Sequence, residues 1–144
     1  MNKIHELIHR LNNPDMGILF IRLALAAVFI NAGWFKVSNL EMVVGGFGEA
    51  GIPAFLAYIV SYGEFIGGIA LLLGIFVRYF GILLSIIMVV AIAKVHFVNG
   101  FSLQNGGYEY VLVLLLGAMA MVAFGSGKYS LAGWLRSRKM TAII

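Results

Sequence analysis

Four long apolar runs constrain the fold of this chain more than any other feature. They cover residues 16–35, 54–76, 79–98 and 108–124, and each contains a single Asp, Glu, Lys or Arg. A helix needs about 20 mostly apolar residues to cross a bilayer. The runs therefore predict an all-α fold, an integral membrane four-helix bundle with the lipid bilayer as its solvent.

The composition supports the same class of protein. Of 144 residues, 62% are hydrophobic and 11% are charged, whereas soluble domains are about 45–50% apolar and about 25% charged. The chain is long enough for one compact domain. Because it contains no Cys, disulfides and thiolate metal sites are excluded. No metal site is expected from its histidines either, since His5 and His9 share a helix face without a third ligand and His96 lies on the other side of the membrane.

Three segments are expected along the chain. Residues 1–15 form an amphipathic interfacial segment, because Ile4, Leu7, Ile8 and Leu11 recur at helical spacing between polar residues. Residues 16–127 hold the four spans, and residues 128–144 form a basic tail. The link between the second and third spans is very short, so these two spans are expected to form an antiparallel hairpin.

The Lys and Arg residues predict the orientation in the membrane. One side holds seven: Lys3, Arg10, Arg78, Lys128, Arg136, Arg138 and Lys139. The other side holds Lys36 and Lys94. Basic residues accumulate on the cytoplasmic side, so both termini are expected in the cytoplasm. The basic residues form no stripe on a soluble surface, and no nucleic-acid partner is expected.

Two ionisable residues lie deep in the apolar runs. At about 1.5 Å per residue, Arg22 is roughly 9 Å from one end of its helix and Glu64 roughly 15 Å from the opposite end of the next. Ionisable groups at such depths face the protein interior by default. Gly67 and Gly68 flank the face of Glu64 and favour close packing there. A buried Arg22–Glu64 pair, a ligand contact and a lone protonated Glu64 are the open interpretations.

A second polar group is expected at the periplasmic end of the bundle. Lys36 ends the first span, His96 ends the third and Glu109 begins the fourth, so the three are expected to converge at one depth with Tyr108. Asn105 and the following glycines would shape the rim of a pocket for an anionic or quinone-like head group. The alternative is a salt-bridge network that only closes the bundle.

These two groups supply the candidate site residues. The candidates for proton transfer or catalysis are His96, Glu109 and Glu64. The candidates for ligand or quinone binding are Arg22, Asn31, Lys36, Glu64, His96, Asn105, Tyr108 and Glu109. No complete catalytic constellation is present, so whether the chain is an enzyme stays open.

Several stretches together resemble the DoxX family of small four-helix membrane proteins. They are RLA at 22–24, FINAGWFK at 29–36, GIP at 51–53, EFIGG at 64–68, HFVNGF at 96–101, NGGYEY at 105–110 and GKYSL at 127–131. The resemblance implies a multi-pass protein of the bacterial cytoplasmic (inner) membrane. It also implies a link to respiratory or oxidative-stress redox systems, since one relative is a subunit of an archaeal thiosulfate:quinone oxidoreductase. Family members often carry Asp after the Tyr-Ser-Leu run, where this chain has Ala132.

Three functions follow as alternatives. The first is a quinone- or quinol-interacting subunit of a membrane redox system, which would need a flavin, a haem or a redox partner subunit to carry electrons. The second is a non-catalytic membrane scaffold or assembly factor. The third is a small-solute or proton transporter, which would need a homo-oligomer to enclose enough volume.

Overall fold

The computed structural model describes residues 3–141, and the regular structure in that range is entirely helical. The prediction of an all-α fold is confirmed. In chain order the helices are α1 (Lys3–Leu11), α2 (Pro14–Ser38), α3 (Leu40–Glu49), α4 (Ala54–Leu73), α5 (Val77–Ala91), the π-helical turn η1 (Ile92–His96), the 3-10 turns η2 (Phe97–Asn99) and η3 (Leu103–Asn105), α6 (Glu109–Phe124) and α7 (Leu131–Thr141).

Three of these helical runs are long and apolar enough to cross a membrane. They are Pro14–Ser38, Ala54–Leu73 and Val77–Asn99, the last formed by α5 continued through η1 and η2. The helix at the fourth predicted span, α6, has 16 residues, which corresponds to about 24 Å against a hydrocarbon core of about 30 Å. The four-helix bundle is thus built from three full-length membrane helices and one shorter apolar helix.

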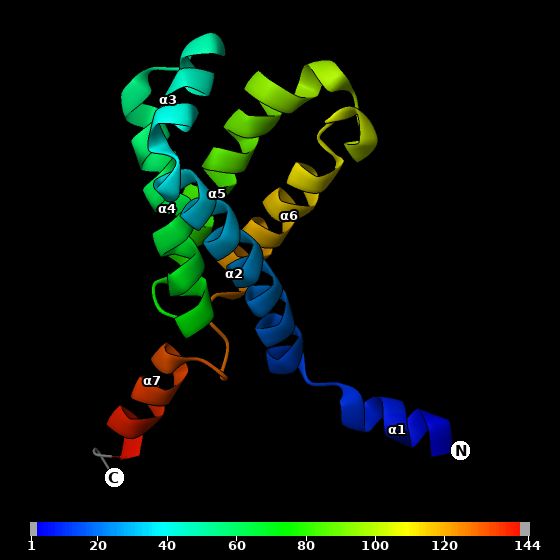
Figure 1. Cartoon of the computed structure of the whole chain (residues 1–144). Coiled ribbons are helices and arrows are strands. Elements are labelled where there is room, and N and C mark those ends of the chain that lie inside the picture. Colours follow the sequence, from blue (N-terminus) through cyan, green and yellow to red (C-terminus); the bar gives the residue numbers. More distant parts are fainter. Residues whose placement is uncertain (1–2, 142–144) are drawn as a thin grey trace.

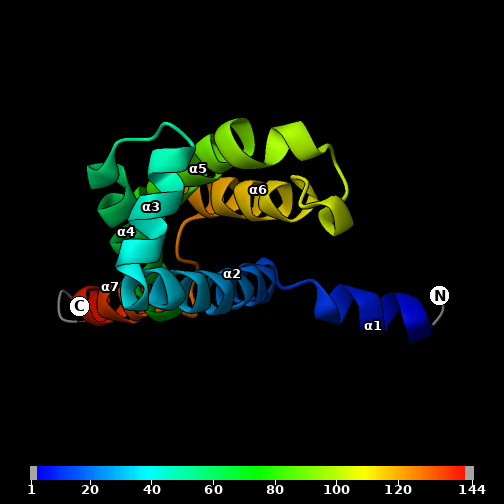
Figure 2. The same cartoon turned by 45° about the horizontal axis from the view of Figure 1, so that its top comes forward.

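The bundle consists of two antiparallel helix pairs that diverge toward one end (Figure 1). Helix α2 packs along α4, and α5 packs along α6, with smaller contacts between the pairs. Both α1 and α7 extend from the same end of the bundle, which we call the terminal end (Figure 1), and they point away from each other, α1 to the right and α7 to the left in Figure 2. The opposite end carries α3 and the turns between α5 and α6, and we call it the loop end.

Glycines set the close approach of the helices within each pair. A Cβ atom on Gly33 of α2 would overlap the backbone of Phe65 in α4, and one on Gly68 of α4 would lie 2.6 Å from the backbone nitrogen of Ile30. In the other pair, a Cβ on Gly81 would lie 3.1 Å from the carbonyl oxygen of Ala118. Small residues are typical of membrane helix interfaces because they let backbones touch.

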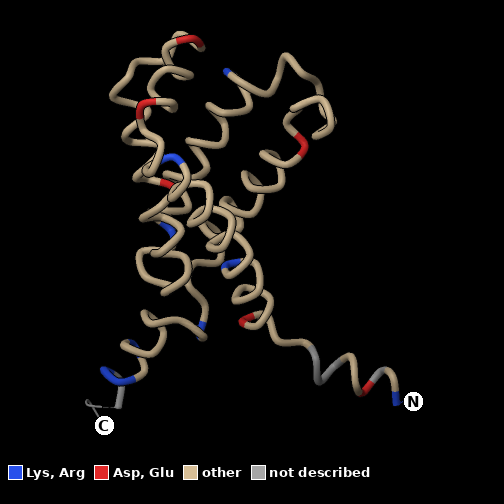
Figure 3. The backbone as a smooth tube through the Cα atoms, viewed as in Figure 1, with Lys and Arg blue, Asp and Glu red and all other residues tan. Residues whose placement is uncertain are grey.

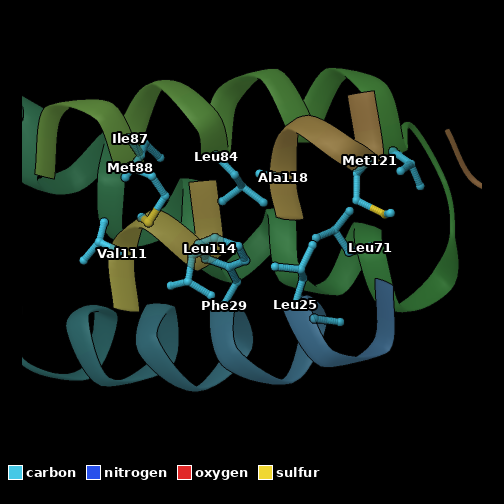
Figure 4. Packing of buried hydrophobic residues seen from close by; sticks show 12 residues of the cluster. Leu25, Phe29, Leu71, Leu84, Ile87, Met88, Val111, Leu114, Ala118 and Met121 are labelled. Carbon is cyan, nitrogen blue, oxygen red and sulfur yellow. The ribbon is translucent and has the colours of Figure 1, made fainter. Parts of the chain in front are cut away.

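The apolar core lies where the two pairs cross. Leu25 and Phe29 of α2 meet side chains from the other three helices, among them Leu71, Leu84 and Met121 (Figure 4). These side chains are almost completely buried. Arg22 faces the interior as expected, and the buried residues of α2 are Arg22, Leu25, Ala26, Phe29 and Gly33.

Helix α3 lies between the first and second apolar runs, outside all four predicted spans. Gly45, Gly46 and Gly48 make this segment a poor helix in isolation, but they meet nothing within 4 Å and cost no packing. The helix is held instead by contacts with α4 and by the buried Val43. Tertiary contacts therefore override the weak intrinsic propensity.

The terminal end carries most of the basic residues. Figure 3 shows Lys and Arg positions gathered along α7 and acidic positions around α3 at the loop end. Helix α1 exposes Ile4, Leu7 and Ile8, as expected for a helix lying on a membrane surface. The basic residues that predict cytoplasmic termini thus lie at one end of the bundle, and the acidic residues of α3 lie at the other end.

Candidate functional site

A cavity of about 830 Å³ occupies the space between the helix pairs toward the loop end. Its wall is mostly aliphatic and comes from all four bundle helices, with Phe47 of α3 and Ile52 closing it from the loop end. Among the lining residues, Ile59 of α4 and Ile86 of α5 are 48% and 58% exposed. The cavity is therefore bordered by partly exposed aliphatic side chains of α4 and α5.

The polar lining residues of this cavity come from different helices. Asn31 and Lys36 project from α2, Glu64 from α4, His96 from η1 and Tyr110 from the first turn of α6. Ligand pockets typically combine an apolar wall with a few convergent polar groups and measure about 300–1,000 Å³. The cavity has both properties.

The central contact of the site is an ion pair between Lys36 and Glu64. The Lys36 Nζ donates to Glu64 Oε2. The Glu64 side chain is 2% exposed, whereas that of Lys36 is 27% exposed. The expectation that Glu64 faces the interior and pairs with a polar group is confirmed, and its partner is Lys36 rather than Arg22.

The register between α2 and α4 explains this choice of partner. Gly33 meets Phe65, and Gly68 meets Ile30, so residues at one level in these antiparallel helices have numbers that sum to 98. By this rule Lys36 is level with position 62, two residues from Glu64, or about 3 Å along the axis. Arg22 is level with position 76, twelve residues from Glu64, or about 18 Å along the axis.

Arg22 instead anchors the linker between α6 and α7 at the terminal end. Its Nη2 donates to the carbonyl oxygen of Tyr129, and its side chain is 2% exposed. Gly74 makes room for the guanidinium, since a Cβ there would overlap it. The next residue, Ser130, caps α7 by accepting from the amide of Gly133 at 2.9 Å. Arg22 therefore lies outside the cavity.

His96 is held in place by the loop between α5 and α6. Its Nδ1 lies 2.8 Å from the carbonyl oxygen of Gly106. A carbonyl oxygen only accepts, so Nδ1 carries the proton and Nε2 of the neutral ring remains an acceptor. His96 belongs to the π-helical turn η1, a distortion that is frequent at functional sites.

Three of the residues expected at this pocket lie outside its lining. Glu109 is exposed, and its Oε2 accepts from the backbone amide of Leu103 at 2.9 Å. Tyr108 stacks on Phe97 with ring centroids 6.0 Å apart, and Asn105 ends the turn η3. Glu109 points away because the buried face of α6 is formed by other positions, namely Val111, Leu114, Ala118 and Met121. Lys36 and His96 thus share the cavity, whereas Tyr108 and Glu109 stabilise the loop above it.

The sequence analysis did not single out the apolar wall. Tyr110 lines the cavity, while Trp34, another aromatic near the same level, faces outward and packs against Phe65 at 5.6 Å. The π-helical turn that carries His96 has no signature in the hydropathy pattern. Among the side chains that the structure describes, which exclude those of His5 and His9, no group of three or more His, Asp or Glu has the arrangement of a metal site.

Comparisons with known proteins identify the family. The DoxX family profile matches residues 17–97. A relative in Bacillus subtilis (strain 168), named "Putative oxidoreductase CatD", is 30% identical over 100 residues, which cover 69% of this chain and 74% of the relative. "Inner membrane protein YqjF" of Escherichia coli (strain K12) is 34% identical over 64 residues, 44% of this chain and about half (49%) of that relative.

No solved structure matches the chain significantly. The family match covers α2, α4, α5 and η1, the elements that supply Lys36, Glu64 and His96. The chain is a membrane protein of the DoxX family.

Proposed function

We propose that this protein binds a quinone or quinol in the cavity and acts as a membrane subunit of a redox system. The observation that carries the proposal is the placement of the Lys36–Glu64 pair in a cavity whose wall is mostly aliphatic. A quinone has the matching chemistry, because its head group carries two carbonyl oxygens and its tail is a hydrocarbon. The head group would lie against Lys36, His96 and Asn31.

The border of the cavity suits a ligand that arrives from the bilayer. Ile59 of α4 and Ile86 of α5 both line the cavity and are partly exposed. An isoprenoid tail would leave between α4 and α5 and contact these side chains. Such contacts gain free energy in proportion to the apolar area that they cover.

Reduction of a quinone to a quinol takes up two electrons and two protons. The Lys36 ammonium would donate a hydrogen bond to one carbonyl oxygen, and Nε2 of His96 would pass the two protons, one after the other, from the loop end to the head group. The electrons would come from a redox partner subunit or its cofactor. The name of the Bacillus subtilis relative agrees with a redox role, and that of the Escherichia coli relative supports placement in a bacterial inner membrane.

Direct binding of a soluble quinone analogue tests the proposal. The protein would be placed in quinone-free lipid nanodiscs and titrated with decylubiquinone and with a short-chain menaquinone, while its fluorescence is recorded. We expect saturable binding by the native protein. We expect Glu64→Gln and Lys36→Gln to weaken binding about tenfold, which corresponds to about 1.4 kcal/mol.

The chain offers matched controls for both substitutions. Glu109→Gln removes a carboxylate, and Lys94→Gln an ammonium, at positions that do not line the cavity. Both are expected to bind the analogues within twofold of the native protein. A native protein without saturable binding would favour the scaffold alternative, and equal losses in all four variants would rule out the cavity as the site.

A further inference from the structure

A second hollow lies at the terminal end of the bundle. It has a volume of about 590 Å³ and is lined by segments far apart in the sequence: the start of α2, the link between α4 and α5, the end of α6 and the start of α7. It shares none of its lining residues with the cavity described above. It is therefore a separate feature of the molecule.

The charges around this hollow are predominantly positive. Arg78, Lys128 and Arg136 line it, and Asp15 is the one acidic lining residue among those described. The three cations and one carboxylate give a net charge of +2. Asp15 is already engaged, because its Oδ1 accepts from the backbone amide of Lys128 at 2.9 Å. The hollow therefore presents a concave basic surface.

The walls of the hollow include aromatic side chains that face outward. Phe76 and Tyr79 are 68% and 75% exposed, and they contact each other edge to face with ring centroids 6.3 Å apart. Phe124, at the end of α6, is also exposed. Tyr and Trp residues collect at the level of the lipid headgroups, and Tyr79 lies in the first turn of α5, level with the helix ends that carry Phe76 and Phe124. The hollow therefore lies at the membrane interface.

We propose that this hollow binds the headgroup phosphate of an anionic phospholipid. Arg78 and Arg136 would bind the phosphate oxygens through charge-assisted hydrogen bonds. The acyl chains would run along Phe76 and Phe124 into the bilayer. The juxtaposition of basic and aromatic walls favours a lipid over a free anion, which would use only the basic half of the surface. If the termini lie in the cytoplasm, as the distribution of Lys and Arg predicts, the lipid comes from the inner leaflet.

Lipid retention by the full-length protein tests this proposal. The protein in detergent would be titrated with phosphatidylglycerol or with phosphatidylcholine of the same acyl chains, and bound lipid would be counted by native mass spectrometry. We expect tighter binding of phosphatidylglycerol. Each removed cation should weaken this binding about fivefold. We therefore expect Arg136→Gln to bind phosphatidylglycerol about fivefold more weakly and Lys128→Gln/Arg136→Gln about 25-fold more weakly.

Several controls distinguish specific binding in the hollow from nonspecific electrostatic attraction of anionic lipid to the basic surface. Lys139→Gln removes a cation on α7 that does not line the hollow, and it is expected to leave binding within twofold. Thermal melting identifies any variant that is misfolded, and Lys128→Gln alone then provides the second test. Equal binding of the two lipids, or an equal loss in Lys139→Gln, would overturn the proposal. Displacement of phosphatidylglycerol by millimolar inorganic phosphate alone would identify a free anion as the occupant and would overturn it as well.

Discussion

Lys36 of α2 and Glu64 of α4 form an ion pair across the glycine-packed interface of these two helices. The pair combines an almost fully buried carboxylate with an ammonium that is partly exposed to the cavity. The Glu64 charge is thereby compensated inside the protein, and the Lys36 ammonium is the accessible member of the pair. The pair consequently serves two purposes, since it satisfies a charge inside the membrane and presents a hydrogen-bond donor to the cavity.

The first prediction concerns the coupling between these two side chains. Removing one partner of a buried pair costs about 3–5 kcal/mol, because the other charge is left uncompensated. We therefore expect Lys36→Met to destabilise the protein strongly and Lys36→Met/Glu64→Gln to destabilise it less than the sum of the two single substitutions. Unfolding by sodium dodecyl sulfate in mixed micelles measures the free energies. Additive effects would show that the two groups are not coupled.

The second prediction concerns the close approach of α2 and α4. A methyl group on Gly33 overlaps the backbone of Phe65, which cannot move aside without shifting the helix. We expect Gly33→Ala to cost about 2 kcal/mol, as is typical of overpacking. Gly17→Ala in the same helix meets nothing within 4 Å and is expected to be neutral or slightly stabilising. Equal melting temperatures for the two variants would contradict the glycine-packed interface.

The third prediction concerns Gly74, the C-cap of α4. Its φ of 70° is in the left-handed region, which costs a residue with a Cβ about 1 kcal/mol, and a Cβ would also displace the Arg22 guanidinium. We expect Gly74→Ala to lower the melting temperature and to release the linker that carries Tyr129. Limited proteolysis between α6 and α7 detects this release. Gly46→Ala, at an open helical position, is the control and should leave both measurements unchanged.

The fourth prediction concerns orientation. The basic residues near the terminal end outnumber those near the loop end, so both termini are expected in the cytoplasm. A fluorescent reporter that folds only in the cytoplasm should be active when fused after residue 144. A phosphatase reporter that is active only in the periplasm should be inactive at the same position. The reverse pattern would overturn the orientation and move the proposed lipid site to the outer leaflet.

Much of the fold could be predicted because lipid imposes a simple rule. The length of the apolar runs alone located α2, α4 and the span that contains α5. A segment that crosses the bilayer must form its backbone hydrogen bonds within itself, which favours an unbroken helix. The same rule failed for α3, whose glycines lower the helix propensity while its contacts with α4 restore the helix. It located α6 to within one residue, because the predicted run 108–124 became the helix Glu109–Phe124.

The candidate site could be predicted only in part. Depth and the neighbouring glycines correctly placed Glu64 in the interior. The partner was missed because depth was counted from helix ends that were assumed to be level. In the structure the α2 end at Ser38 is level with position 60, so α4 starts six residues, about 9 Å, beyond it. Such an offset between helices is a tertiary property that hydropathy does not encode.

The glycine contacts also determine how the cavity can change size. Backbone meets backbone at Gly33, Gly68 and Gly81, all within a helix pair, whereas Gly67 and Gly117 meet only side chains of the other pair. Because the backbones touch within each pair and only side chains meet between the pairs, we expect each pair to move as a unit and the boundary between the pairs to yield first. The volume of the cavity would then depend mainly on the angle between the α2–α4 pair and the α5–α6 pair. A ligand that widens the cavity would have to tilt whole helices. Because Arg22 of α2 holds the linker between α6 and α7 at the terminal end, we expect ligand binding to displace that linker.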